Sequence, residues 1–128
     1  MVEVEFRLMR LFQLGEFTLH GGDKSFFKID CDALSDADWE CLAYMIAVKS
    51  APFRDVVGIP RGGTKLAHAM AKYATPDNDG LPVLVVDDVW TTGGSMKNAL
   101  GPDNIGWVVF ARNPIDDRRV NALFTMGR

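Results

Sequence analysis

The sequence predicts one α/β domain with a compact, mostly parallel sheet, flanking helices and a small N-terminal segment. Short apolar runs that are typical of strands alternate with segments whose apolar residues recur at helical spacing. The runs are apolar at consecutive positions, as expected for strands that helices cover on both faces. The chain has 128 residues, 48% of them hydrophobic, which is enough for one core.

About the first 34 residues differ in pattern from the rest. Residues 4–14 have apolar side chains at helical spacing and predict a short amphipathic helix. Two short strands are expected at residues 17–20 and 25–31, on either side of the glycine-containing turn at residues 21–23. The α/β core is then expected from about residue 35 to residue 128.

The core begins with a helix that Ser35 opens. Asp38 stands three residues later, where it completes an acidic version of the capping box. The apolar residues that follow fall on one helical face. They are Trp39, Leu42, Ala43, Ile46 and Ala47.

Four strands and two further helices follow. The strands are expected at residues 55–59, 83–86, 105–111 and 120–126. A helix after the first of them, reaching residue 74, would turn Leu66, Ala67, Met70 and Ala71 inward and Lys65, His68 and Lys72 outward. A shorter helix opens at Gly94 and Ser95 and ends by Gly101.

The charge and the cysteines exclude several classes of protein. A net charge of −3 argues against general affinity for nucleic acid, which requires a basic face. No apolar stretch is long enough to cross a bilayer, and charged residues interrupt the N-terminus where a signal peptide would be apolar. Cys31 and Cys41 match no zinc-site spacing and imply no disulfide framework, so a cytoplasmic location is expected.

Residues 83–95, with the sequence VLVVDDVWTTGGS, combine features that would hold a phosphorylated sugar. The strand ends in Asp87 and Asp88, whose ionised carboxylates accept hydrogen bonds such as those from sugar hydroxyls. A turn follows that brings glycines, hydroxyls and N–H groups to the start of a helix, where a phosphate is favoured. This turn consists of Thr91, Thr92, Gly93, Gly94 and Ser95. The segment therefore predicts a site for ribose 5-phosphate.

Two other interpretations fit parts of this segment. A turn with an acidic helix cap would explain the glycines and hydroxyls alone, but not the whole string. A receiver domain also has paired acids at a strand end, where they bind magnesium. In that domain the acids lie near the start of the chain, and no phosphate-binding turn follows directly.

A second glycine-rich turn, GIPRGG at residues 58–63, also joins a strand to a helix. Arg61 supplies a cationic fork, and Gly62 and Gly63 supply exposed N–H groups, so the turn can hold another anion. An ordinary tight turn is the alternative. Arg112 stands at the end of the strand expected at residues 105–111, where it could meet a ligand. The alternative interpretation of Arg112 is an ordinary surface cation. Ligands of α/β sheets bind at the carboxyl ends of strands, so three strand ends would bring these groups to one edge.

Residues 83–95 resemble the phosphoribosyl-pyrophosphate motif of the type I phosphoribosyltransferases at every position but Trp90, where an aliphatic residue is usual. The resemblance implies that Asp87 and Asp88 bind the ribose 2- and 3-hydroxyls and that residues 91–95 bind the 5-phosphate. Magnesium would lie at the same two acids, held through the ligand or through water.

The turn at residues 58–63 resembles the pyrophosphate loop of that family. The resemblance implies that Pro60, Arg61, Gly62 and Gly63 bind pyrophosphate, and it makes Arg61 a catalytic residue together with the two acids. That loop often holds a cis peptide bond, and the resemblance implies one between Pro60 and Arg61.

The N-terminal segment resembles the hood of the orotate branch of the family. Phe26 and Phe27 match an aromatic pair that frames the base, and Arg112 matches an arginine that pairs with the acidic base. His20 stands where that branch usually has a lysine. The resemblance covers roughly residues 10–112, and it implies a nucleobase as second substrate, with an orotate-like pyrimidine favoured. The family also favours dimers, so a homodimer is expected.

The chain departs from the family before the ribose-phosphate strand, where members usually carry another strand and a mobile, cation-bearing lid. Here a stretch of about seven residues, which doubled back projects only about 10 Å, takes their place. No Lys or Arg occurs between Lys72 and Lys97. The expected function is a compact, magnesium-dependent phosphoribosyltransferase of nucleotide metabolism. The alternative is a reduced module that binds phosphoribosyl pyrophosphate or a nucleotide without efficient turnover. The intact acids and turns argue against a purely structural protein.

Overall fold

The computed structural model describes residues 11–18 and 24–126, and the chain forms two compact units, Met1–Asp38 and Trp39–Arg128. In the first unit, β1 (Phe12–Thr18) pairs with β2 (Lys24–Ile29) in an antiparallel sheet. Phe12 lies opposite Ile29 and Leu14 opposite Phe27, and the register shifts between Leu14 and Phe17. Both expected strands are therefore present, although the first begins earlier than the sequence indicated.

The helix expected at residues 4–14 is wrong for residues 12–14, which belong to β1. Their backbone pairs with β2, and such pairing outweighs the helical spacing of a few apolar residues. Residues 4–10 and 19–23, which include part of that helix, the end of the first expected strand and its turn, lie outside the described residues.

A short 3₁₀ helix, η1 (Cys31–Ala33), and the helix α2 (Asp36–Lys49) follow. The expected capping box is confirmed: the N–H of Ser35 donates to Oδ2 of Asp38 (2.9 Å), and the N–H of Asp38 donates to Oγ of Ser35 (3.1 Å). These bonds satisfy backbone donors that have no partner inside the helix. α2 buries Trp39, Ala43 and Ile46, whereas Leu42 and Ala47 stay partly exposed.

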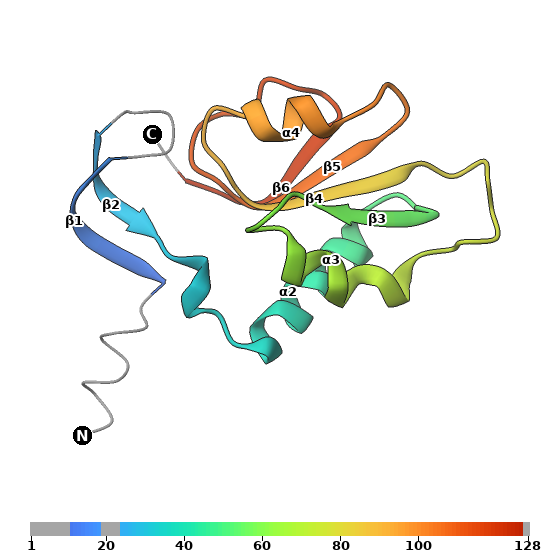
Figure 1. The fold of residues 1–128 in the computed structure, drawn as a ribbon, viewed down its shortest axis with the longest axis horizontal. Coiled ribbons are helices and arrows are strands. Elements are labelled where there is room, and N and C mark those ends of the chain that lie inside the picture. The colour runs from blue at the N-terminus through green and yellow to red at the C-terminus, as the bar shows by residue number, and fades with distance from the viewer. Residues whose placement is uncertain (1–10, 19–23, 127–128) are drawn as a thin grey trace. The chain divides into compact units, whose positions relative to one another are not determined.

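The second unit contains a four-stranded, fully parallel sheet with the order β3-β4-β5-β6 (Figure 1). Its strands are β3 (Asp55–Gly58), β4 (Val83–Trp90), β5 (Ile105–Ala111) and β6 (Val120–Thr125). The expected α/β class and the four strands are confirmed. β4 lies between β3 and β5, so the segment with the paired acids occupies the middle of the sheet.

Two helices flank this sheet. α3 (Thr64–Met70) lies on one face and α4 (Gly94–Ala99) on the other (Figure 1). The sequence predicted one helix to residue 74, but α3 tightens after Met70 into the 3₁₀ helix η2 (Ala71–Tyr73). Tightening changes the angle between successive side chains, so Ala71 is exposed rather than inward. Within α3 itself, Ala69 is buried together with Leu66 and Met70.

The core occupies both faces of β4. Val85 packs on one face in a cluster with α4 and the neighbouring strands, whose other buried members are Trp90, Met96, Leu100, Val108, Ala111 and Val120. Leu84 and Val86 alternate with Val85 and are fully buried. Each such side chain contributes about 1.5–3 kcal/mol when it is fully buried.

β4 is longer than the apolar run at residues 83–86. Residues 87–90 continue the strand, with Asp87 beside Val108 and Trp90 beside Ala111 of β5. A central strand finds backbone partners on its neighbours even where its side chains are polar, so the acids lie within the strand rather than after it. Among the described residues, no helix is long and apolar enough to cross a membrane.

Candidate functional site

Three chain segments converge at the carboxyl edge of the parallel sheet. They are the turn that follows β3, the end of β4 with the turn before α4, and the end of β5. Because the strands are parallel, these segments leave the sheet at the same edge. The structure therefore brings together the candidate binding residues of the second unit that the sequence singled out: residues 60–63, Asp87, Asp88, residues 91–95 and Arg112.

The turn after β3 is held against β4. The N–H of Ile59 donates to the carbonyl oxygen of Val86 (2.9 Å), and the N–H of Gly63 donates to the carbonyl oxygen of Ile59 (2.8 Å). The peptide bond between Pro60 and Arg61 is cis, as the resemblance of this turn implied. A Cβ at Gly63 would lie 2.3 Å from the Val86 carbonyl oxygen, so only glycine fits there.

This geometry changes what the turn can offer an anion. Gly63 is buried and its N–H is engaged, so the exposed N–H that the sequence suggested for this residue is not available. Arg61 is exposed and Gly62 is half-buried. Both residues therefore have surface that a ligand can reach.

Asp87 and Asp88 are half-buried at the end of β4. The N–H of Asp88 donates to Oδ1 of Asp87 (2.8 Å), and the N–H of Val89 donates to Oδ1 of Asp88 (2.7 Å). Burial raises the pKa of Asp87 to about 8, and the carboxyl group of Asp88 adds to that increase. Two acids this close are costly to ionise together, and a cation or a pair of donating hydroxyls would reduce that cost.

The carboxylate of Asp88 lies directly over the turn that follows β3. A Cβ at Gly62 would stand 2.4 Å from Oδ2 of Asp88 and 2.5 Å from its carboxyl carbon. This position must therefore be glycine as long as the carboxylate stays in place. The contact joins the acid pair and the Arg61 turn into one continuous polar surface.

The turn between β4 and α4 presents unused backbone donors. Gly93 has a positive φ of 84°, and Gly94 begins α4. Within the described residues, the N–H groups of residues 92–95 donate to no protein acceptor. Consecutive free N–H groups at a helix start attract anions. Thr92, Gly94 and Ser95 are exposed, so an anion can reach them.

Trp90 lies beneath this turn. Its side chain is 2% exposed and belongs to the core cluster, with the Nζ of Lys97 5.5 Å from the ring centroid. A Cβ at Gly93 would lie 2.2 Å from two atoms of the Trp90 ring. The Trp90 ring therefore supports the turn from the interior of the second unit.

Arg112 is half-buried just after β5, and its N–H donates to the carbonyl oxygen of Trp90 (2.8 Å). Burial lowers the pKa of its guanidinium, which remains a cation at neutral pH. The next residue, Asn113, was not identified from the sequence, yet its Nδ2 donates to the carbonyl oxygen of Thr91 (2.7 Å). Nothing in the local pattern distinguishes this asparagine from any other turn residue.

Phe26 and Phe27 lie on β2 in the first unit, where Phe27 pairs with Leu14. The sheet edge described above is formed by the second unit alone, so a base contact by these two residues stays a prediction. His20 lies outside the described residues.

Residues 75–81, between η2 and β4, form a compact turn. The N–H of Thr75 donates to the carbonyl oxygen of Phe53 (2.8 Å), and the N–H of Leu81 donates to that of Asn78 (3.2 Å). The stretch enters β4 at Val83, the amino end of the strand, whereas the acids stand at its carboxyl end. In the part of the chain that the structure describes, this stretch therefore contributes nothing to the candidate site.

The donors at the edge suit a hard cation that is shared with a ligand. Among the described residues, no group of three or more His, Cys, Asp or Glu is placed to hold a metal. Magnesium characteristically binds through one or two carboxylates together with substrate phosphates and water. Asp87 and Asp88 fit that pattern, and a cation bound there would oppose the rise in the pKa of Asp87 that burial causes.

Comparison with known proteins finds the same fold in solved structures, although no family model and no curated sequence matches the chain. The orotate phosphoribosyltransferase of Aeropyrum pernix superposes with a TM-score of 0.73 at 20% identity, over 98% of this chain and 94% of that one. The UMP synthase of Leishmania donovani has a TM-score of 0.72 at 19% identity, over 92% of this chain but only 34% of its own length.

A third similar structure is the Mycobacterium tuberculosis H37Rv orotate phosphoribosyltransferase in complex with inorganic phosphate. Its TM-score is 0.66 at 19% identity, over 96% of this chain and 94% of that one. At such identities the likeness concerns the path of the backbone. This chain therefore has the type I phosphoribosyltransferase fold, in the form found in orotate phosphoribosyltransferases.

Proposed function

We propose that this chain binds 5-phosphoribosyl-1-pyrophosphate with magnesium and transfers the phosphoribosyl group to a nucleobase, with an orotate-like pyrimidine favoured. The observation that carries the proposal is the juxtaposition at the sheet edge. A carboxylate pair lies against the Arg61 turn on one side and leads directly into a turn of free N–H groups on the other. Acceptors for a diol thus stand between two places for anions, in the order that a ribose with phosphates at C5 and C1 requires.

Each part of the ligand has a counterpart in this arrangement. The 5-phosphate would accept hydrogen bonds from the N–H groups of residues 92–95 and from the hydroxyls of Thr91, Thr92 and Ser95. The ribose 2- and 3-hydroxyls would donate to Asp87 and Asp88. The pyrophosphate would meet Arg61 and the N–H of Gly62, beside Pro60.

In the proposed reaction, a nitrogen of the base forms a bond to C1 of the ribose as the bond from C1 to the pyrophosphate oxygen breaks. Negative charge grows on the leaving group, and Arg61 is placed to stabilise it. Magnesium, when bound, would neutralise charge on the phosphate oxygens, held by Asp87 and Asp88 through the ligand or through water. Arg112 would pair with an acidic base, and Phe26 and Phe27 would frame its ring.

The alternative is a reduced module that binds the same sugar phosphate without efficient turnover. It is favoured by the compact turn at residues 75–81, which lies at the opposite edge of the sheet and carries no cation. Losing one positioned donor costs about 10²–10³ in rate, and an open site also admits water. We further propose a cytoplasmic protein of nucleotide metabolism, with a dimer partner as one means of closing the site.

The direct test measures binding and turnover with the same preparation. Calorimetry reports the affinity for phosphoribosyl pyrophosphate with magnesium, and pyrophosphate release is followed with orotate and a panel of other bases. Asp87→Asn and Asp88→Asn should each weaken binding at least about tenfold, the cost of about one charge-assisted hydrogen bond. Asp79→Asn, an exposed acid in the compact turn, serves as the matched control.

The outcomes separate the two candidate functions. Binding with pyrophosphate release supports the enzyme, whereas binding without release from any base supports the binding module. If the protein does not bind the ligand, or if the Asp87 and Asp88 variants bind as well as the Asp79 variant, both functions are wrong.

A further inference from the structure

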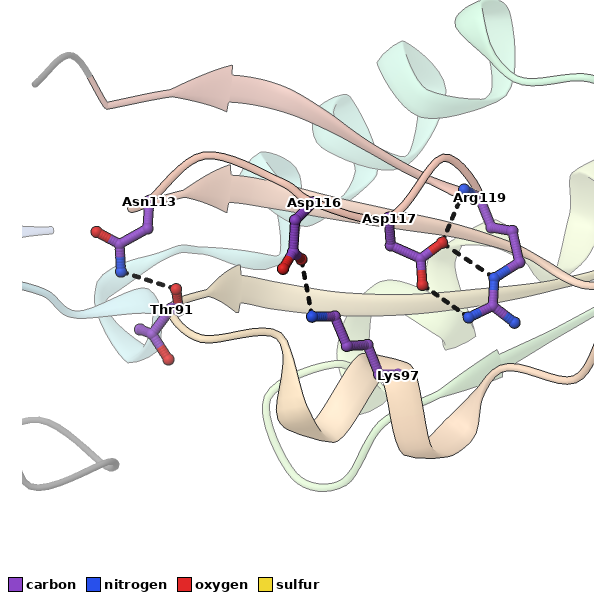
Figure 2. Close-up of polar contacts among 6 residues, drawn as sticks. All are labelled: Thr91, Lys97, Asn113, Asp116, Asp117 and Arg119. Atoms are coloured by element: carbon purple, nitrogen blue, oxygen red, sulfur yellow. Dashed lines mark hydrogen bonds and ion pairs between the residues drawn. The ribbon is translucent and has the colours of Figure 1, made fainter.

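The connection between β5 and β6 is bonded at three places: to the turn before α4, to α4 itself and to the segment after it. At its start, Asn113 donates from Nδ2 to the carbonyl oxygen of Thr91 (2.7 Å). In the middle, Asp116 pairs with Lys97 of α4 (Nζ to Oδ1, 2.8 Å). At the far end, Nη1 of Arg119 donates to the carbonyl oxygen of Gly101 (3.1 Å). Figure 2 shows the first two of these contacts reaching from one connection to the strand end and the helix.

The contacts differ in what they hold. Arg119 also forms a two-pronged pair with Asp117, with Nε to Oδ1 at 3.0 Å and Nη2 to Oδ2 at 2.7 Å, which anchors the connection near β6 (Figure 2). The Lys97–Asp116 pair joins two exposed side chains and contributes little to stability. Of the side chains in these contacts, that of Asn113 bonds directly to the backbone of the turn that presents the free N–H groups.

The Asn113 contact sets the orientation of a peptide group. A peptide unit is planar, and in its trans form the C=O and the following N–H point in opposite directions. Holding the Thr91 carbonyl toward Asn113 therefore holds the Thr92 N–H away from it. That N–H is the first of the series at residues 92–95 that has no protein acceptor in the described part of the chain.

We infer that Asn113 is a positioning residue, which presets the Thr92 N–H for the 5-phosphate of the sugar. The inference rests on the proposed function, since it assigns a role within the same phosphate site. Asn113 directly follows Arg112, whose own N–H donates to the Trp90 carbonyl oxygen (2.8 Å). The two adjacent residues thus tie the end of β5 to two successive carbonyl groups, those of Trp90 and Thr91.

The test uses ligands that occupy different halves of the site. Ribose 5-phosphate contacts the turn that Asn113 holds, whereas magnesium pyrophosphate meets the Arg61 turn. Asn113→Ala should weaken ribose 5-phosphate by about three- to tenfold, the range for one net hydrogen bond. Magnesium pyrophosphate should bind with unchanged affinity. Asn113→Asp should weaken ribose 5-phosphate further, because a carboxylate oxygen would face the Thr91 carbonyl oxygen.

The control is Asp116→Asn, which removes the ion pair with Lys97 from the same connection and leaves Thr91 untouched. It should bind both ligands as the unaltered protein does. Circular dichroism checks that each variant is folded. If Asn113→Ala does not fold, the affinity of Asn113→Asp for ribose 5-phosphate provides the test. Asn113 is exposed, so either substitution is compatible with the core.

The inference is overturned if the folded Asn113 variants bind ribose 5-phosphate normally, or if they lose affinity for both ligands equally, as a merely structural residue would. Failure of the proposed function looks different. In that case the unaltered protein itself binds neither ligand, and the role of Asn113 falls with it.

Discussion

Replacing Gly93 by alanine tests the geometry of the phosphate turn most directly. Gly93 has a φ of 84°, a conformation that costs an ordinary residue about 1–2 kcal/mol. The added Cβ would also lie 2.2 Å from Cη2 and Cζ2 of the buried Trp90 ring. Overpacking of this kind costs about 1–3 kcal/mol. The Gly93→Ala protein should therefore lose about 2–5 kcal/mol, a large part of the roughly 5–15 kcal/mol that stabilises a typical domain.

The two contributions can be separated with a second substitution. In a Trp90→Leu background, no ring stands in the way of the Cβ, so Gly93→Ala should cost only the conformational part, about 1–2 kcal/mol. The difference between the two backgrounds is the coupling energy of a double-mutant cycle, expected at about 1–3 kcal/mol. Urea unfolding followed by circular dichroism measures each variant, because tryptophan fluorescence would itself change with Trp90.

Gly94→Ala is the matched control for this cycle. Gly94 is the first residue of α4, its φ is not positive, and a Cβ there would meet nothing closer than Thr92 Oγ1 at 3.9 Å. That substitution should be neutral or stabilise the protein by up to about 1 kcal/mol, since alanine favours helices over glycine. The reasoning is refuted if Gly93→Ala costs no more than Gly94→Ala, or if its cost is the same in both backgrounds.

Two further predictions concern the acid pair. The raised pKa of Asp87, about 8 against an ordinary 3.8, means that the folded protein holds a proton which the unfolded chain releases. The ligand-free protein should therefore lose stability as the pH rises from about 4 to about 8, and Asp87→Asn should remove that part of the slope. Thermal unfolding of the unaltered protein and of Asp87→Asn across this pH range checks the prediction. A difference in stability between the two proteins that does not change with pH would contradict it. Gly62→Ala should push the carboxylate of Asp88 from its place, since the Cβ would lie 2.4 Å from Oδ2, and break its 2.7 Å bond from the Val89 N–H. It should destabilise the protein by about 1–3 kcal/mol and weaken binding of phosphoribosyl pyrophosphate, so unchanged urea unfolding and affinity would count against the contact.

Much of the fold follows from local patterns. The strand at residues 105–111 was predicted with its observed bounds, because its apolar run is long and turn residues mark both ends. The capping box of Ser35 and Asp38 depends on residues three positions apart, so it is visible in the sequence. The turns at residues 58–63 and 91–95 could be located for a similar reason, since glycines and hydroxyls between a strand and a helix form a local signal.

The candidate site could be predicted only in part. That Asp87, Asp88 and Arg61 share one sheet edge follows from the alternation of strands and helices alone. The alternation does not determine whether the Trp90 side chain is buried or exposed, because the direction of a side chain near a strand end depends on what packs against it. The bond from Asn113 to Thr91 joins residues 22 positions apart and has no sequence signal.

The sequence by itself thus determined the α/β class, the order of the elements and which polar residues reach the carboxyl edge of the sheet. These properties depend on periodicity and on short motifs, whose interactions span a few residues. The tertiary structure decided the N-terminal strand, the length of β4, the placing of the Asp88 carboxylate over Gly62 and the tryptophan beneath Gly93. Each depends on a contact between segments far apart in the chain, and such a contact is decided only when the whole core packs.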